Sequence, residues 1–130
     1  MDKSKDRTSM PGVNFAELLA RVESDRELLR DLLLIFKEDF PRLFQALQEA
    51  VSRRASAQVA AVSHTLKGML ANLAATRAAA CAAELEQLGR AKDTASLAKA
   101  LVAFEHEALR LIPEMETYLV EAQHEDSHSR

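Results

Sequence analysis

The sequence predicts an all-α fold, an antiparallel up-and-down four-helix bundle with a short additional N-terminal helix. The composition supports this class, with 48% hydrophobic and 28% charged residues and only three glycines and three prolines to interrupt helices. Runs of β-branched residues, which are typical of strands, are absent. Four stretches carry apolar residues at helical spacing, and short polar connections separate them.

The helical domain is expected to span residues 14–120, between two polar ends. Residues 1–13 are expected to be a flexible lead-in, and residues 121–130 a disordered polar tail. The first helix is short and begins near Asn14, whose side chain can cap it while Glu17 completes a capping-box pattern. We expect this helix to cover the bundle as a lid.

The second helix is long and opens at a clearer start signal. Ser24, followed three residues later by Glu27, forms a capping box, and the periodic apolar residues extend to Leu47. Pro41 lies inside this stretch. A proline within a helix removes one hydrogen bond and clashes with the preceding turn, so we expect a kink or a division there.

The third helix is expected to begin with Ser56 as its N-cap and to face the bundle with a seam spaced by three or four residues. The seam residues are Val59, Val62, Leu66, Leu70 and Leu73. The fourth helix is expected from Thr76 to Leu88, with Gly89 near its carboxyl end. The fifth is expected to start at Asp93 or Thr94 and, with a kink at Pro113, to continue toward Val120.

Charge and cysteine content exclude several classes of function. The net charge is −3 and the estimated pI about 5.8, so no strong basic field favours nucleic acid or anionic lipid. Cys81 is the single cysteine, which fits a reducing compartment, and no apolar run approaches the roughly 20 residues that span a bilayer. We therefore expect a cytoplasmic monomer.

Gly68 is unexpected where it stands, because it interrupts a strong helical pattern in which glycine costs roughly 1 kcal/mol relative to alanine. It follows His64 by four residues, so both lie on one helix face, and Lys67 lies beside them. The missing side chain at residue 68 leaves the imidazole uncovered. The arrangement indicates a reactive histidine.

The helix face around His64 lacks most of the long polar side chains that a solvated face carries. Small residues would let another macromolecule approach a projecting nucleophile closely, so we expect a docking surface. Its expected members are Ala60, Ala61, Met69, Ala71, Asn72 and Ala75. Two plainer interpretations stay open: an ordinary surface histidine, and an alanine face that packs against another helix of the bundle.

The segment His64-Thr65-Leu66-Lys67-Gly68, followed by Ala71-Asn72-Leu73, resembles the signature of histidine-containing phosphotransfer (HPt) domains of bacterial two-component phosphorelays. That signature is approximately His-x-Leu-Lys-Gly, followed by a small residue and Asn-Leu-Gly. The resemblance extends to the order of the helices over residues 14–120. The chain departs from the pattern at Ala74, where the family often has glycine, and at Met69, where a small residue is common.

The resemblance implies a role for each residue of the motif. His64 would accept a phosphoryl group from a receiver-domain aspartate, or from a kinase, and pass it to a response-regulator aspartate. Lys67 would offset phosphoryl charge, and Gly68 would keep the approach to the imidazole clear. The chain would be a phosphoryl carrier with no ATP site and no intrinsic cofactor or metal, because the receiver domain would supply Mg²⁺.

Three alternatives stay open. The bundle could bind a receiver or kinase without being phosphorylated, or it could be an HPt-type module excised from a hybrid or chemotaxis-type histidine kinase. The dimerisation-and-phosphoacceptor helix pair of a sensor kinase is disfavoured, because such segments usually place an acidic residue directly after the histidine. This chain has Thr65 there.

Overall fold

The computed structural model describes the backbone of residues 12–128 and the side chains of residues 12–121. Every regular element in this part of the chain is helical, which confirms the predicted all-α class. The elements are α2 (Phe15–Arg21), α3 (Arg26–Ser52), α4 (Ser56–Asn72), α5 (Thr76–Arg90), the 3₁₀ turn η1 (Thr94–Ser96), α6 (Leu97–Leu109) and α7 (Leu111–His128). The predicted flexibility of residues 1–11 lies outside the described residues.

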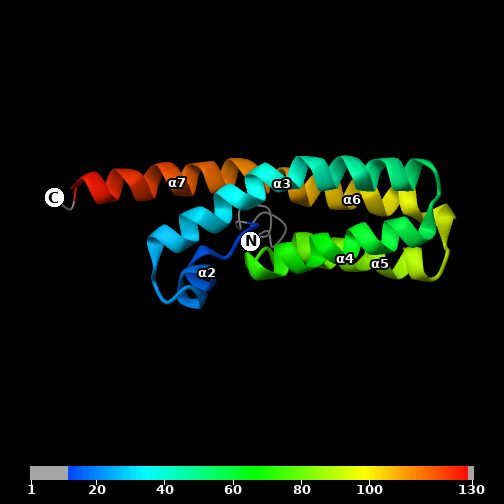
Figure 1. Cartoon of the computed structure of the whole chain (residues 1–130), viewed down its shortest axis with the longest axis horizontal. Helices are drawn as coiled ribbons and strands as arrows, with labels where there is room; N and C mark the ends of the chain where they lie inside the picture. The colour runs from blue at the N-terminus through cyan, green and yellow to red at the C-terminus, as the bar shows by residue number, and fades with distance from the viewer. Residues whose placement is uncertain (1–11, 129–130) are drawn as a thin grey trace, which may run out of the picture.

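Four helices form the body of the domain. Contacts join α3 to α4, α4 to α5, α5 to α6, and α6 back to α3. Figure 1 shows these helices lying side by side, with α7 continuing the line of α6 beyond them and α2 beside the N-terminal part of α3. No helix of the described residues has the length and apolar character that a membrane crossing requires.

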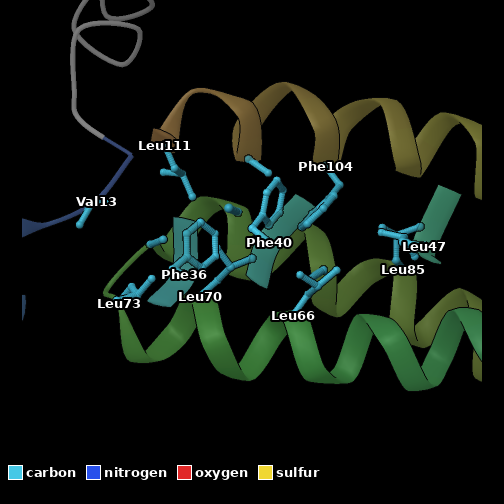
Figure 2. Close-up of a cluster of buried hydrophobic side chains, with 14 of the residues drawn as sticks. Val13, Phe36, Phe40, Leu47, Leu66, Leu70, Leu73, Leu85, Phe104 and Leu111 are labelled. Atoms are coloured by element: carbon cyan, nitrogen blue, oxygen red, sulfur yellow. The ribbon is translucent and has the colours of Figure 1, made fainter. Parts of the chain in front are cut away.

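The core is built from phenylalanine and leucine side chains that these helices point inward. Phe36 and Phe40 of α3 stack with ring centroids 5.1 Å apart, and Phe40 lies 6.4 Å from Phe104 of α6. Leu66 and Leu70 of α4 are fully buried against them (Figure 2). Burying such a side chain contributes about 1.5–3 kcal/mol, so this layer fixes the face that α4 turns inward.

At the start of α3, the N-cap differs from the predicted one. The side chain of Asp25, and not that of Ser24, caps the helix by accepting the backbone N–H of Leu28 at 3.0 Å. Ser24 instead adopts a left-handed backbone, with φ of 62°, in the preceding turn. Pro41 lies within the continuous helix, and the ribbon changes direction along α3 (Figure 1). Pro41 therefore does not divide the helix.

The last predicted helix is interrupted earlier than expected, at Arg110, which separates α6 from α7. Pro113 has no N–H to donate to the carbonyl of Leu109, so one helical hydrogen bond is missing next to this break. The prediction of a disordered tail from residue 121 was wrong for the backbone as far as His128, which is helical. No proline or glycine follows Val120 to end the helix.

The chain before α2 is packed, which corrects the predicted lead-in at its last two residues. Gly12 and Val13 are buried, and their backbone N–H groups donate to the Glu114 carboxylate at 2.7–3.1 Å. The N–H of Asn14 donates to the carbonyl of Ala74, in the turn between α4 and α5, at 3.1 Å. These bonds tie the start of the domain to α7 and to the end of α4.

The ends of α4 and α5 also differ from the sequence interpretation. Ser56 is the first residue of α4, and the N-cap is Ala55, whose side chain makes no capping bond. Gly89 lies within the last turn of α5, where a Cβ would come within 2.8 Å of Ala60 N and of Ser56 O. Glycine is therefore required at residue 89 by the close approach of α4.

The two helical glycines predict opposite effects of alanine on stability. Gly68→Ala adds a Cβ that meets no atom within 4 Å in the described part of the chain, so the free energy of unfolding should rise by about 1 kcal/mol from helix propensity. Gly89→Ala forces the Cβ against backbone atoms of α4, and this overpacking should lower the free energy of unfolding by about 1–3 kcal/mol. Urea unfolding followed by circular dichroism checks both. Equal effects of the two substitutions would contradict this account.

Candidate functional site

Helix α4 presents His64, Lys67 and Gly68 on one side because its other side packs into the core. Its buried residues are Val59, Ser63, Leu66 and Leu70, so Ser63 replaces the half-buried Val62 in the predicted seam. The side chain of His64 is 65% exposed and that of Lys67 is 38% exposed. Gly68 is exposed one turn after His64.

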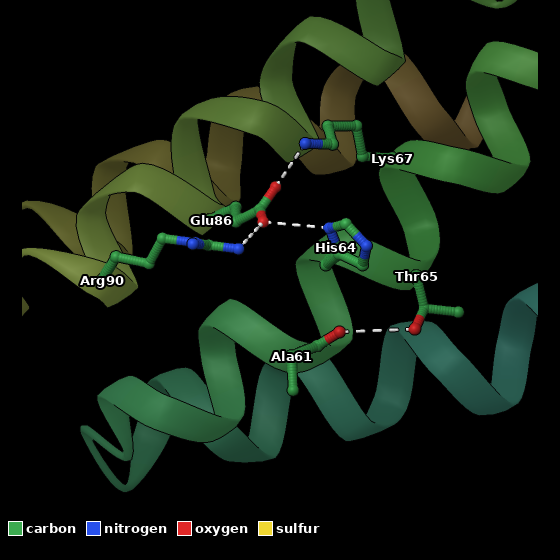
Figure 3. Close-up of polar contacts among 6 residues, drawn as sticks. All are labelled: Ala61, His64, Thr65, Lys67, Glu86 and Arg90. Atoms are coloured by element: carbon green, nitrogen blue, oxygen red, sulfur yellow. Dashed lines mark hydrogen bonds and ion pairs between the residues drawn. The ribbon is translucent and has the colours of Figure 1, made fainter.

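Glu86 of α5 joins His64 to Lys67 (Figure 3). One carboxylate oxygen, Oε2, lies 3.0 Å from Nδ1 of His64, and the other, Oε1, lies 2.6 Å from Nζ of Lys67. Arg90, one turn further along α5, donates from Nη2 to Oε2 at 2.7 Å. The Glu86 side chain is only 6% exposed, so one buried carboxylate serves three partners from two helices.

The partners of Glu86 determine its charge. The hydrogen bond from Lys67 lowers the pKa of this carboxyl most, and the bonds from Arg90 and His64 add to that effect. Burial acts in the opposite direction, yet the pKa falls from 4.5 to about 2. Glu86 is therefore ionised throughout the physiological pH range.

An ionised carboxylate fixes the tautomer of His64. Because Glu86 can only accept hydrogen bonds, Nδ1 of His64 must be the donor. In a neutral imidazole with a proton on Nδ1, Nε2 carries the free lone pair. Figure 3 shows this second ring nitrogen on the side of the ring away from Glu86. In the neutral ring, the Nε2 lone pair is thus turned away from Glu86.

Two hollows open beside His64. The larger, about 520 Å³, lies between α4 and α5, and we call it the α4–α5 hollow. Its lining residues are Ser56, Ala57, Ala60, Ala61, His64, Gly89, Arg90 and Lys92. The smaller, about 360 Å³, surrounds the carboxylate, and we call it the Glu86 hollow. It is lined by His64, Lys67, Ala83, Glu86, Gln87 and Arg90.

The predicted docking residues toward the start of α4 divide between two environments. Ala61 is exposed, and its carbonyl accepts the hydroxyl of Thr65 at 3.3 Å. Ala60 is half-buried, and its backbone faces Gly89 of α5. The alternative in which part of the alanine face packs within the bundle therefore holds at Ala60.

Toward the end of α4, Ala71 and Asn72 are exposed and Met69 is half-buried. Met69 and Asn72 line a small hollow of about 120 Å³ with Leu32 and Ile35 of α3. The carbonyl of Ala71 accepts a hydrogen bond from the Arg21 side chain of α2 at 2.6 Å. Ala71 and Asn72 are therefore accessible to a partner, whereas Met69 and Asn72 border α3.

Ala75 does not belong to the docking surface. It is fully buried, because α4 ends at Asn72 and the chain turns through Leu73 and Ala74 before α5 begins. Projecting the helical periodicity of α4 beyond its last residue placed Ala75 on the wrong side. The left-handed backbone of Ala74, with φ of 56°, makes this turn.

Glu86 and Arg90 are the site residues that the sequence interpretation missed. A signal was present, since Glu86 falls among the inward-facing positions Ala82, Leu85 and Gly89. A carboxylate at such a position is almost always paired, and Arg90 four residues later is a suitable partner. The histidine as the other partner could not be identified without the packing of α5 against α4.

The low pKa of Glu86 predicts a pH-dependent contribution to stability. The charged form is favoured in the folded state, so its contribution is complete above about pH 4.5 and is lost as the pH falls through about 2. In urea unfolding, the difference in the free energy of unfolding between the wild type and Glu86→Gln should therefore become smaller from pH 5.5 to pH 2. Glu38→Gln, at an exposed position of α3, is the control. A gap that stays constant over this range would contradict the assignment.

Comparisons with known proteins identify the family of the chain. The family model described as the Hpt domain matches residues 31–121, which is more than half of the chain and includes α4 and α5. Searches of curated proteins and of solved structures found no match. The protein belongs to the Hpt domain family, whose members act in phosphotransfer of two-component signalling and interact with receiver domains and kinases.

Proposed function

We propose that this protein is a phosphorelay intermediate that carries the phosphoryl group on Nε2 of His64. It takes the group from a receiver-domain aspartate, or from a kinase, and passes it to a response-regulator aspartate. The observation that carries the proposal is the bond from Nδ1 of His64 to Glu86 at 3.0 Å, because it leaves Nε2 with a lone pair toward solvent.

The transfer step needs no proton movement at His64. The Nε2 lone pair attacks phosphorus, an N–P bond forms, and the P–O bond to the partner's aspartate breaks, so the aspartate leaves as a carboxylate. The imidazole ring gains positive charge in this step while Nδ1 keeps its proton. Glu86 lies against that proton and stabilises the developing charge. The reverse sequence returns the phosphoryl group to an aspartate.

Lys67 is the cation on α4 that can offset the charge of the incoming phosphoryl group. Its ammonium is held by Glu86 Oε1 at 2.6 Å, so it is ordered near the imidazole before a partner arrives. Phosphoryl transfer depends mainly on positioning and electrostatics, and one lysine supplies only part of both. We expect the partner to supply the remaining groups and the Mg²⁺ ion, since Glu86, the one carboxylate among the described residues that line the two hollows, is already bound to two cations.

The partner would approach over Gly68 and the exposed small residues of α4. A Cβ at residue 68 would meet nothing within 4 Å among the described residues, so no contact in this part of the chain requires glycine there. An incoming domain supplies the missing reason.

We further infer an antiparallel up-and-down arrangement of α3 to α6, which their closed set of contacts supports. We also infer a monomer that acts in the cytoplasm.

His64→Gln should abolish phosphorylation, because glutamine offers no nucleophilic nitrogen at this position. The measurement is transfer of ³²P from an acetyl-phosphate-loaded receiver domain to the purified chain. His106→Gln, at an exposed position of α6, is the matched control and should be labelled like the wild type. Persistent labelling of His64→Gln would overturn the assignment of His64.

Gly68→Leu should slow transfer at least about tenfold, since the new side chain occupies the approach of the partner, a loss of about 1.4 kcal/mol or more in the transition state. The fold should be retained, because the space at residue 68 is open within the chain. Ala103→Leu, at an exposed position of α6, controls for adding an apolar side chain. Single-turnover transfer rates provide the test, and an unchanged rate would refute the steric role of glycine.

A further inference from the structure

One oxygen of Glu86 is shared between the histidine and an arginine. Oε2 lies 3.0 Å from Nδ1 of His64 and 2.7 Å from Nη2 of Arg90, whereas Lys67 donates to Oε1. The arginine and the imidazole therefore compete for the negative charge of the same atom. Arg90 can reach this oxygen because it lies one turn after Glu86 on the same helix.

The charges around this oxygen are few. Lys67 of α4, Glu86 and Arg90 of α5, and Lys92 of the turn after α5 are the charged residues that line the two hollows beside His64. Glu86 is the one carboxylate among these lining residues. Whatever negative potential reaches His64 from the lining thus comes through Glu86, and Arg90 directly reduces it.

We propose that Arg90 is a positioning residue that limits the pull of Glu86 on the Nδ1 proton and so keeps His64 in its neutral, nucleophilic form. This inference rests on the proposed phosphoryl transfer. Glu86 alone would fix the tautomer, but its full charge beside Nδ1 would also favour protonation of Nε2, which removes the lone pair. Arg90 preserves the first effect and weakens the second.

The direction of the effect follows from the charges. Replacing Arg90 with glutamine removes one positive charge and leaves Oε2 to the imidazole alone, and both changes favour imidazolium. Because the Arg90 side chain is 68% exposed, water screens its charge and the effect is modest. Replacing Arg90 should therefore move the ring modestly toward its protonated form.

The test is an NMR titration of the His64 ring in four proteins: wild type, Arg90→Gln, Glu86→Gln, and the double variant. Arg90→Gln should raise the midpoint and Glu86→Gln should lower it. In the Glu86→Gln background, the shift caused by Arg90→Gln should shrink to less than half. Arg42→Gln, which removes an exposed arginine 3.8 Å from Asp39 on α3, is the control and should leave the midpoint unchanged.

Phosphotransfer supplies the second readout. The acid limb of the pH–rate profile for transfer onto His64 should move upward with the midpoint in Arg90→Gln, so the variant is slower than wild type near pH 6 and not near pH 8. An unmoved midpoint, or the same shift with and without Glu86, would overturn the role of Arg90. Absence of labelling in the wild type would instead overturn the proposed function, and the NMR titration would remain informative.

Discussion

The site depends on the close packing of α5 against α4. A carboxylate can be buried beside His64 only if cations pair with it, because an unpaired buried charge is strongly unfavourable. Lys67 reaches Glu86 from α4 and Arg90 reaches it from α5. Gly89 permits this approach, since any side chain there would meet the backbone of α4.

This packing links the stability of the fold to the chemistry of the histidine. Glu86 is ionised because Lys67, Arg90 and His64 all donate to it. The same ionisation requires a proton on Nδ1 and leaves the lone pair on Nε2. The electrostatic cluster therefore has two effects: it offsets the cost of burying the carboxylate, and it orients the His64 ring.

The exposed side of the site is correspondingly sparse. Gly68 adds no side chain over the imidazole, and neighbouring residues such as Ala61 and Ala71 are small and exposed. A family whose members interact with receiver domains and kinases fits such a surface, because the partner can cover what the chain leaves open. The proposed relay divides the chemistry accordingly, with the nucleophile on this chain and the metal on the partner.

The sequence by itself determined the helical class, and the spacing of His64, Lys67 and Gly68 was enough to place them on one exposed face. Local periodicity suffices there, because the three residues lie within about one turn of one helix. It failed at Ala75, beyond the end of α4, and it could not pair His64 with Glu86. Those residues are 22 positions apart on different helices, so only the tertiary packing of α4 and α5 could bring the carboxylate to the imidazole.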